Sequence, residues 1–338
     1  MDKRIPVTLL TGFLGSGKTT LLNKLLRHEG MKDTAVIINE IGKAGLDHIL
    51  SRHVDDTYIA DNTVLLGSGC LCCTLREELA DTMRDLFFRR ELEVIPKFTR
   101  LVIETTGLAD PGPILASLLN QPIIGPNFRL DAVVVTVDAE YGLRQIEQHA
   151  EANKQAAIAD VLLLTKVDLV SQTQLDSLAD ALQALNSGAT QHRISQGEID
   201  PQAIINVGLF DPHTRQAQPQ RWLRATSRAH STHSTLPQKV HDDAIVNFTI
   251  TLPTALTWTQ IEPALKWLCA TFGERLLRMK GILYVEGYPA PLVVHAVQHT
   301  LYPAASLVGW SEDQPSSRLV LIGKGLDEKQ IRDRLMKI

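Results

Sequence analysis

Residues 12–19 read Gly12-Phe13-Leu14-Gly15-Ser16-Gly17-Lys18-Thr19 and come just after the apolar run Val7-Thr8-Leu9-Leu10. The pattern Gly-x4-Gly-Lys-[Ser/Thr], between a buried strand and a helix, is typical of a phosphate-binding P-loop. Its glycines let backbone N–H groups converge on phosphate oxygens, and the N-terminus of the following helix adds partial positive charge. The sequence therefore predicts a site for a nucleoside triphosphate.

Two side chains of this loop are predicted to carry its chemistry. Lys18 is expected to reach the β- and γ-phosphates, and the hydroxyl of Thr19 is expected to ligate Mg²⁺. The residues predicted to contact the nucleotide from this segment are Gly12, Gly15, Ser16, Gly17, Lys18, Thr19 and Thr20.

The composition is that of an ordinary soluble globular chain, long enough at 338 residues for about two domains. A net charge of −4 gives no support to a nucleic-acid or anionic-membrane partner. We find no apolar stretch near the roughly 20 residues that span a bilayer, and no apolar core of a signal peptide. Three of the four cysteines lie within residues 70–73, which indicates a reducing compartment and metal or redox chemistry. The expected location is the cytoplasm.

Short β-branched runs alternate with helical patterns from residue 5 to about residue 207. This alternation predicts an α/β fold: a mostly parallel, doubly wound P-loop sheet. The expected strands are 5–11, 35–39, 63–66, 100–104, 131–138, 161–165 and 203–207, and the expected helices are 18–28, 74–90, 112–119, 142–159 and 172–186.

A second, smaller α+β domain is expected after a polar linker. Residues 210–243 are rich in polar residues and poor in aliphatic ones, which is typical of a linker. Beyond them, Thr257 and Gln260 form a capping box that opens a helix over 258–272. The predicted division is a P-loop domain at 1–209, the linker at 210–243 and a C-terminal domain at 244–338. Its predicted strands lie near 246–250, 281–286, 291–297 and 318–323, and a last helix lies at 327–337.

A second motif concerns the base of the nucleotide. Thr165-Lys166-Val167-Asp168 follows the strand 161–165 and matches the guanine-recognition pattern [Asn/Thr]-Lys-x-Asp. The carboxylate of Asp168 can accept hydrogen bonds from N1–H and the N2 amine of guanine, and the stem of Lys166 can lie along the base. Adenine would leave this carboxylate unpaired, at a cost of about 1–3 kcal/mol. The predicted nucleotide is GTP.

Acidic residues that could serve Mg²⁺ or the attacking water come from two places. Glu104 ends the apolar strand 100–104, so we expect it near the Mg²⁺, with the N–H of Gly107 sensing the γ-phosphate; a structural acidic residue at a strand end is the alternative. In the loop 39–47, Glu40 or Asp47 is expected to bind Mg²⁺ or to orient the water, and the sequence does not choose between them. The predicted catalytic residues are Lys18, Glu40, Asp47 and Glu104.

The cysteine cluster Gly69-Cys70-Leu71-Cys72-Cys73 directly precedes the predicted helix 74–90. A helix N-terminus lowers the pKa of a thiol and favours the thiolate. Thiolates this close favour a soft or borderline cation, with Zn²⁺ as the default, and three ligands would leave one position open for transfer. Cys70, Cys72 and Cys73 are therefore the predicted metal ligands; a buried cysteine turn and a redox pair are the alternatives.

With these motifs in this order, the chain resembles the CobW-like metal-chaperone GTPases, a family of SIMIBI-class P-loop GTPases, and most nearly their YjiA-type members. The likeness includes 39–42 and 104–113 and extends into the C-terminal part at 276–283 and 310–313. It implies Mg²⁺-dependent GTP hydrolysis, binding of Zn²⁺ or Co²⁺ at the three cysteines, and metal transfer to a client protein. Ile38 and Lys43 stand where some relatives carry acidic residues, which weakens the case for a second metal site there.

The predicted function is that of a GTP-hydrolysing metallochaperone in which the γ-phosphate biases the geometry of the cysteines. Hydrolysis is expected to be slow without a partner, because no arginine or glutamine stands out as catalytic. The expected partner is a client metalloprotein, and a homodimer is left open. Two alternatives remain: a metal buffer or sensor that GTP merely stabilises, and a P-loop kinase for a small molecule.

Overall fold

The computed structural model describes residues 3–38, 64–67, 75–205, 207, 245–253, 256–307 and 316–338. The chain divides into two compact units, Met1–Ala179 with Gln191–Gly208, and Asp180–Thr190 with Leu209–Ile338. The predicted loop 39–47, the cysteine cluster 70–73 and the linker 210–243 lie outside the described residues.

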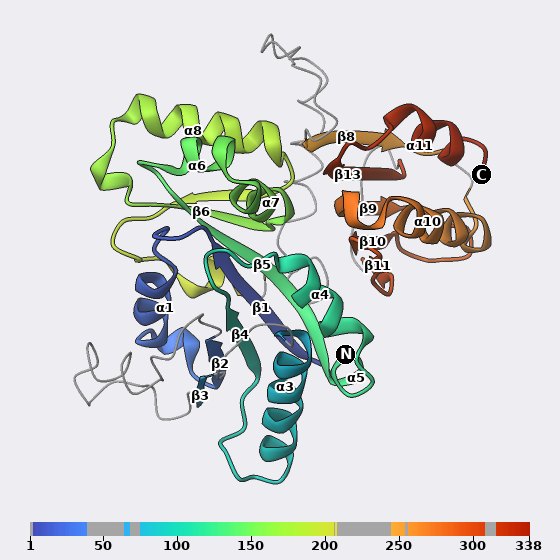
Figure 1. Ribbon diagram of the computed structural model, residues 1–338. Coiled ribbons are helices and arrows are strands. Elements are labelled where there is room, and N and C mark those ends of the chain that lie inside the picture. The colour runs from blue at the N-terminus through green and yellow to red at the C-terminus, as the bar shows by residue number, and fades with distance from the viewer. Residues whose placement is uncertain are drawn as a thin grey trace. The chain divides into compact units, whose positions relative to one another are not determined.

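The first unit is built on a seven-stranded sheet with the order β3-β2-β4-β1-β5-β6-β7 (Figure 1). Every pairing from β3 to β6 is parallel, which confirms the predicted fold class. The strands are β1 (Ile5–Gly12), β2 (Thr34–Ile38), β3 (Val64–Gly67), β4 (Arg100–Glu104), β5 (Phe128–Asp138), β6 (Val161–Thr165) and β7 (Thr190–Arg193).

Helices cover both faces of this sheet (Figure 1). Successive strand residues point to opposite faces. Leu10 and Val134 pack with Leu21 of the first helix, whereas Val135 faces Ala152 of the helix at Ala150–Ile158. The described helices are α1 (Lys18–Leu26), α3 (Leu75–Glu91), α4 (Pro111–Asn120), α5 (Ile124–Asn127), α6 (Gly142–Gln148), α7 (Ala150–Ile158) and α8 (Gln172–Leu185).

Two sequence predictions in this unit are wrong in detail. The helix expected over 142–159 is interrupted at His149, whose extended backbone (φ −123°, ψ 117°) separates α6 from α7. The strand expected at 203–207 is absent from the described residues of that range, because Asp200 caps a short 3₁₀ turn at Pro201–Ala203 instead. Its apolar residues Ile204 and Ile205 are buried in the core rather than paired in the sheet. The last strand is β7, whose polar sequence carries no strand signal.

The second unit is an antiparallel sheet with helices, as predicted. Its strands follow the order β11-β10-β9-β13-β8, and β12 pairs with β10. The backbone N–H of Thr257 donates to the side-chain oxygen of Gln260 at 3.0 Å, and Gly273 follows the end of α10. The elements are β8 (Ile245–Thr251), α10 (Trp258–Phe272), β9 (Leu276–Leu283), β10 (Leu292–Val297), β11 (Thr300–Leu301), β12 (Ala305–Ser306), β13 (Arg318–Lys324) and α11 (Glu328–Leu335).

This unit has its own core, in which α10 and α11 pack against one face of the sheet. Leu265 and Leu268 of α10 and Ile331 of α11 are fully buried there with Leu321 of β13. Across the described residues, no helix is both long and apolar enough to cross a membrane.

Candidate nucleotide-binding site

The P-loop connects the end of β1 to the start of α1 and depends on its glycines. Gly12, Gly15 and Gly17 have φ angles of 143°, 73° and 92°, a region that residues with a Cβ rarely adopt. A Cβ on Gly12 would lie 2.3 Å from Oγ1 of Thr136, so the close approach of β1 to β5 also excludes a side chain. Ser16 Oγ lies 2.7 Å from the same Thr136 Oγ1. The loop therefore has the open backbone that a phosphate cradle needs.

Lys18 is the first residue of α1, and its ammonium group lies within the loop that precedes it. Its Nζ donates to the carbonyl oxygen of Gly12 at 2.8 Å and to that of Phe13 at 3.2 Å. The residue is only 8% exposed. A positive charge held by the loop itself, next to the N-terminus of a helix, attracts phosphate.

Thr19, in the first turn of α1, meets Glu104 at the end of β4. Glu104 ends β4, where its register partners are Leu10 of β1 and Ile38 of β2, and its side chain is buried. The hydroxyl of Thr19 donates to Oε1 of Glu104 at 3.0 Å. A hydroxyl beside a carboxylate at the foot of a P-loop is the kind of oxygen donor set that Mg²⁺ takes. The residues present thus fit the predicted ion.

The segment after Glu104 lies against the P-loop. A Cβ on Gly107 would be 2.7 Å from the backbone nitrogen of Leu14, so a residue with a side chain could not sit there. Thr105 donates its hydroxyl to that of Thr11 at 2.7 Å, which fixes the start of the segment to β1. Gly107 is therefore placed beside the loop, as the motif requires.

The Thr-Lys-x-Asp element is bound to the P-loop by its first residue. Thr165 Oγ1 donates to the backbone oxygen of Ser16 at 2.8 Å. Lys166 has a left-handed backbone (φ 57°), and its Nζ contacts Oδ2 of Asp138 at 2.7 Å. Asp168 is exposed and accepts a hydrogen bond from Ser195 Oγ at 2.7 Å. The two motifs, almost 150 residues apart in sequence, form one site.

Three contributors to this site were not predicted as such. Asp138 ends β5 and is buried, and its Oδ1 accepts from the backbone N–H of Glu140 at 2.8 Å. Asp138 is the last residue of the predicted strand 131–138, and this position could have marked it as a site residue. Ser195 follows β7, and Gln155 lies inside α7; neither position carries a motif.

The loop after β7 also contacts α1. A Cβ on Gly197 would lie 3.0 Å from the backbone oxygen of Thr20, an exposed residue in the first turn of α1. The predicted residues Gly12, Gly15, Ser16, Gly17, Lys18, Thr19, Thr20, Glu104, Gly107, Thr165, Lys166 and Asp168 are thus all in the described part of the site.

The predicted metal ligands and two of the catalytic candidates cannot be placed in this way. Cys70, Cys72, Cys73, Glu40 and Asp47 lie outside the described residues. Within the part of the chain that is described, no three His, Cys, Asp or Glu residues cluster in a way that would hold a metal ion. Cys269 is buried in the core of the second unit, and burial raises the pKa of its thiol to about 12, so it is a structural thiol.

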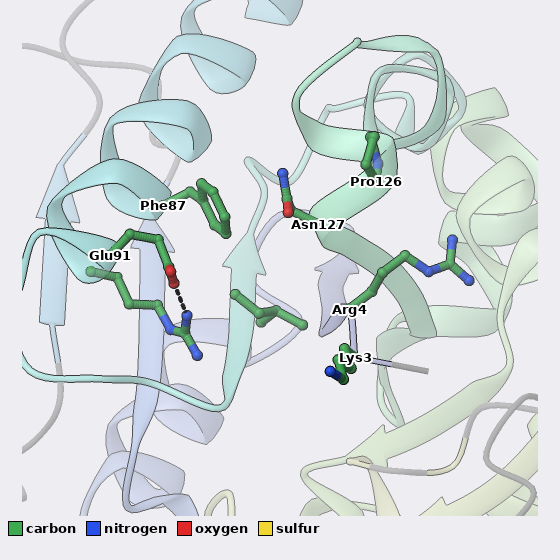
Figure 2. Close-up of a pocket in the computed structure, with 8 residues that line it drawn as sticks. Lys3, Arg4, Phe87, Glu91, Pro126 and Asn127 are labelled. Carbon is green, nitrogen blue, oxygen red and sulfur yellow. Dashed lines mark hydrogen bonds and ion pairs between the residues drawn. The ribbon is translucent and has the colours of Figure 1, made fainter. Parts of the chain in front are cut away.

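A hollow lies at the other end of the sheet, beside the first residues of β1 (Figure 2). It has a volume of about 500 Å³ and contains none of the predicted site residues that the structure describes. Arg90, which lines it, donates to the backbone oxygen of Phe98 at 2.9 Å and pairs with Glu91. This hollow is separate from the nucleotide-binding end of the sheet, where β1 ends at Gly12.

A P-loop joined to a Thr-Lys-x-Asp element, with a threonine hydroxyl beside a carboxylate, defines a P-loop GTPase. Two protein-family models identify the kind of P-loop GTPase. The CobW/HypB/UreG nucleotide-binding domain matches residues 6–193, and the C-terminal domain of the cobalamin synthesis protein CobW matches residues 245–338. The chain therefore belongs to the CobW/HypB/UreG family.

Individual relatives support this assignment, one of them over nearly the whole chain. The zinc chaperone YjiA of Escherichia coli K12 is 33% identical over 331 residues, 97% of this chain and 96% of the relative. The zinc-regulated GTPase metalloprotein activator 1 of Schizosaccharomyces pombe is 31% identical over 58% of this chain and 47% of its own length.

Solved structures show the same likeness. The crystal structure of the zinc-bound YjiA GTPase of Escherichia coli superposes with a TM-score of 0.70 at 28% identity and covers 98% of each chain. A zinc-bound YjiA variant with one glutamate and two cysteines replaced by alanine gives a TM-score of 0.71 at 29% identity, over 98% of this chain and 99% of that one.

Proposed function

We propose that this chain is a GTP-hydrolysing metallochaperone of the cytoplasm. It binds Zn²⁺ (or Co²⁺) through Cys70, Cys72 and Cys73 and transfers the metal to a client metalloprotein in a manner that depends on the nucleotide. The observation that supports the GTP part most is the hydrogen bond from Thr165 to Ser16, because it joins the base-reading element to the phosphate loop. The metal part is supported by relatives that are named zinc chaperones and zinc-regulated activators.

In this proposal the phosphates lie in the loop 12–18, Lys18 stabilises their charge, and Asp168 reads the guanine. Mg²⁺ would be held by Thr19, with Glu104 beside it, and would neutralise charge that develops on the phosphates. Glu40 and Asp47 are the candidates that orient the attacking water. The functional division remains 1–209 for hydrolysis, 210–243 as linker and 244–338 as the second domain, which the ranges of the two family models support.

The cysteine assignment is tested by replacing Cys70, Cys72 and Cys73 together with serine. Zinc affinity and stoichiometry are measured by competition with a chromogenic chelator. We expect the triple variant to lose one high-affinity zinc per chain, because serine hydroxyls are poor ligands for a borderline cation. The matched control is Cys269→Ala, the fourth cysteine, which we expect to keep the wild-type zinc affinity.

Affinity, rather than the mere presence of zinc, is the required measurement, since a YjiA variant that lacks two cysteines was crystallised with zinc. A triple variant that binds zinc as tightly as the wild type would contradict the assignment. Equal zinc affinities with GDP and with a non-hydrolysable GTP analogue would remove the nucleotide dependence. A swing from 1% to 99% occupancy needs a difference of about 5.5 kcal/mol between the two nucleotide states.

A further inference from the structure

Gln155, in the middle of α7, is a fully buried polar residue that lies outside every predicted motif. Its Nε2 donates to the backbone oxygen of Gly107 at 3.2 Å and to that of Ala109 at 3.1 Å. Both acceptors belong to the segment that follows Glu104. A primary amide is the neutral side-chain group that offers two hydrogens from one nitrogen, so a single residue can hold two carbonyl groups without burying a charge.

The segment held in this way is the one that lies on the P-loop. Gly107 approaches Leu14 so closely that a Cβ would be 2.7 Å from its nitrogen. The carbonyl of Gly107 accepts a hydrogen bond from Gln155, and its Cα lies too close to the P-loop residue Leu14 to carry a side chain. Both observations restrict the position of the Gly107 backbone beside the P-loop.

Other contacts of α7 reach the same region. Lys154 pairs with Asp110 at 3.3 Å, and Oδ1 of Asp110 accepts from the backbone N–H of Gly112 at the start of α4. The ring of His149, just before α7, stacks on Phe13 of the P-loop with 4.7 Å between ring centroids. The residue that precedes α7 thus contacts the P-loop, and the middle of the helix contacts the Gly107 segment.

We propose that Gln155 is a positioning residue that pre-orients residues 107–109 for the γ-phosphate and thereby sets the preference of this site for GTP over GDP. The inference rests on the proposed role of the Gly107 N–H. GDP lacks the γ-phosphate, so its affinity does not depend on how well this segment is ordered. GTP must order the segment when it binds, and a pre-ordered segment reduces that entropic cost.

The test replaces Gln155 with Met, which has a similar length and no donor. Dissociation constants for GDP and for a non-hydrolysable GTP analogue are measured by fluorescence titration with Mg²⁺ present. We expect the analogue to bind about tenfold more weakly, which corresponds to about 1.4 kcal/mol, and GDP to bind within about twofold of the wild type. The tenfold figure is within the range for the loss of two neutral hydrogen bonds.

The matched control is Asn153→Leu in the same helix. Asn153 donates to the backbone oxygen of Ile146 in α6 at 3.1 Å. It makes neither of the two hydrogen bonds that Gln155 donates to residues 107 and 109. This variant is expected to lower the midpoint of thermal unfolding and to leave the ratio of the two dissociation constants unchanged. It separates a general loss of stability from a specific effect on the γ-phosphate.

A Gln155→Asn variant guards against misfolding of the Met variant, because it keeps the amide and shortens its reach by one methylene. The same selective loss is expected from it. Equal weakening of GDP and the GTP analogue, or tighter binding of the analogue, in either variant overturns the inference. If the wild type itself fails to bind GDP and GTP, the proposed function fails, which is a different outcome from an unchanged ratio.

Discussion

At the scale of single residues, the site depends on a few side-chain hydrogen bonds that join its separate segments. Thr165 binds the backbone of Ser16, and Thr19 binds Glu104. Asp168 is exposed, and its carboxylate accepts a hydrogen bond from Ser195. Because a carboxylate accepts several hydrogen bonds, it can keep this one while it also binds a guanine base. Base selection should therefore respond to Asp168 more than to any other residue of its element.

We predict that Asp168→Asn weakens GTP binding by about 1–3 kcal/mol, or roughly 5- to 150-fold, because an amide replaces one of the two acceptor oxygens that face N1–H and the N2 amine with a donor. The same variant should bind xanthosine triphosphate better than the wild type does, since the amide can donate to its C2 carbonyl. Isothermal titration with the two nucleotides checks both expectations. Unchanged GTP affinity would mean that the base is read elsewhere.

At the scale of elements, some helices contact the site through residues that the apolar pattern of their own sequence does not predict. Helix α7 presents alanines to the sheet and Gln155 to the Gly107 segment, although its sequence shows only a weak apolar face. Helix α10 illustrates the opposite case. Its start is encoded locally, because Gln260 accepts from both the N–H and the hydroxyl of Thr257.

We predict that Gln260→Ala lowers the free energy of unfolding of the second unit by about 1 kcal/mol, because the first turn of α10 loses its capping acceptor. Urea denaturation followed by tryptophan fluorescence measures this, since Trp258 and Trp267 lie on the same helix. As a control, Lys266→Ala removes only an exposed ion pair with Glu262 and should change stability by less than about 0.5 kcal/mol. A Gln260→Ala variant as stable as the wild type would argue against the cap.

At the scale of the whole molecule, the two units have separate cores. The cluster of the first unit contains β1, β5 and α1 residues, and that of the second contains β9, β13 and α10 residues. All nucleotide contacts proposed above lie in the first unit. A ligand that binds only the folded form of one unit stabilises that unit by mass action.

We predict two transitions in scanning calorimetry, of which GDP with Mg²⁺ raises only one. At a ligand concentration 100 times the dissociation constant, the stabilisation should be about 2.7 kcal/mol. Lys18→Ala should abolish this shift, because it removes the charge within the P-loop, and the second transition should stay where it was. A single transition that moves as a whole would show that the units unfold together.

Local patterns were enough to predict the parallel sheet, the strand–loop–helix of the P-loop and the start of α10, because each is encoded in residues adjacent in sequence. They failed where neighbours in space come from distant segments. The apolar spacing continues through His149, so the sequence predicted one helix where the structure has two. The buried pair Ile204 and Ile205 has the apolar character of a strand but lies in the core outside the sheet.

The contacts of Gln155 with Gly107 and of Ser195 with Asp168 span 48 and 27 residues. Such pairs form only after the strands align. A buried amide or a carboxylate requires a hydrogen-bond partner, but the sequence around it does not show which distant residue will supply that partner.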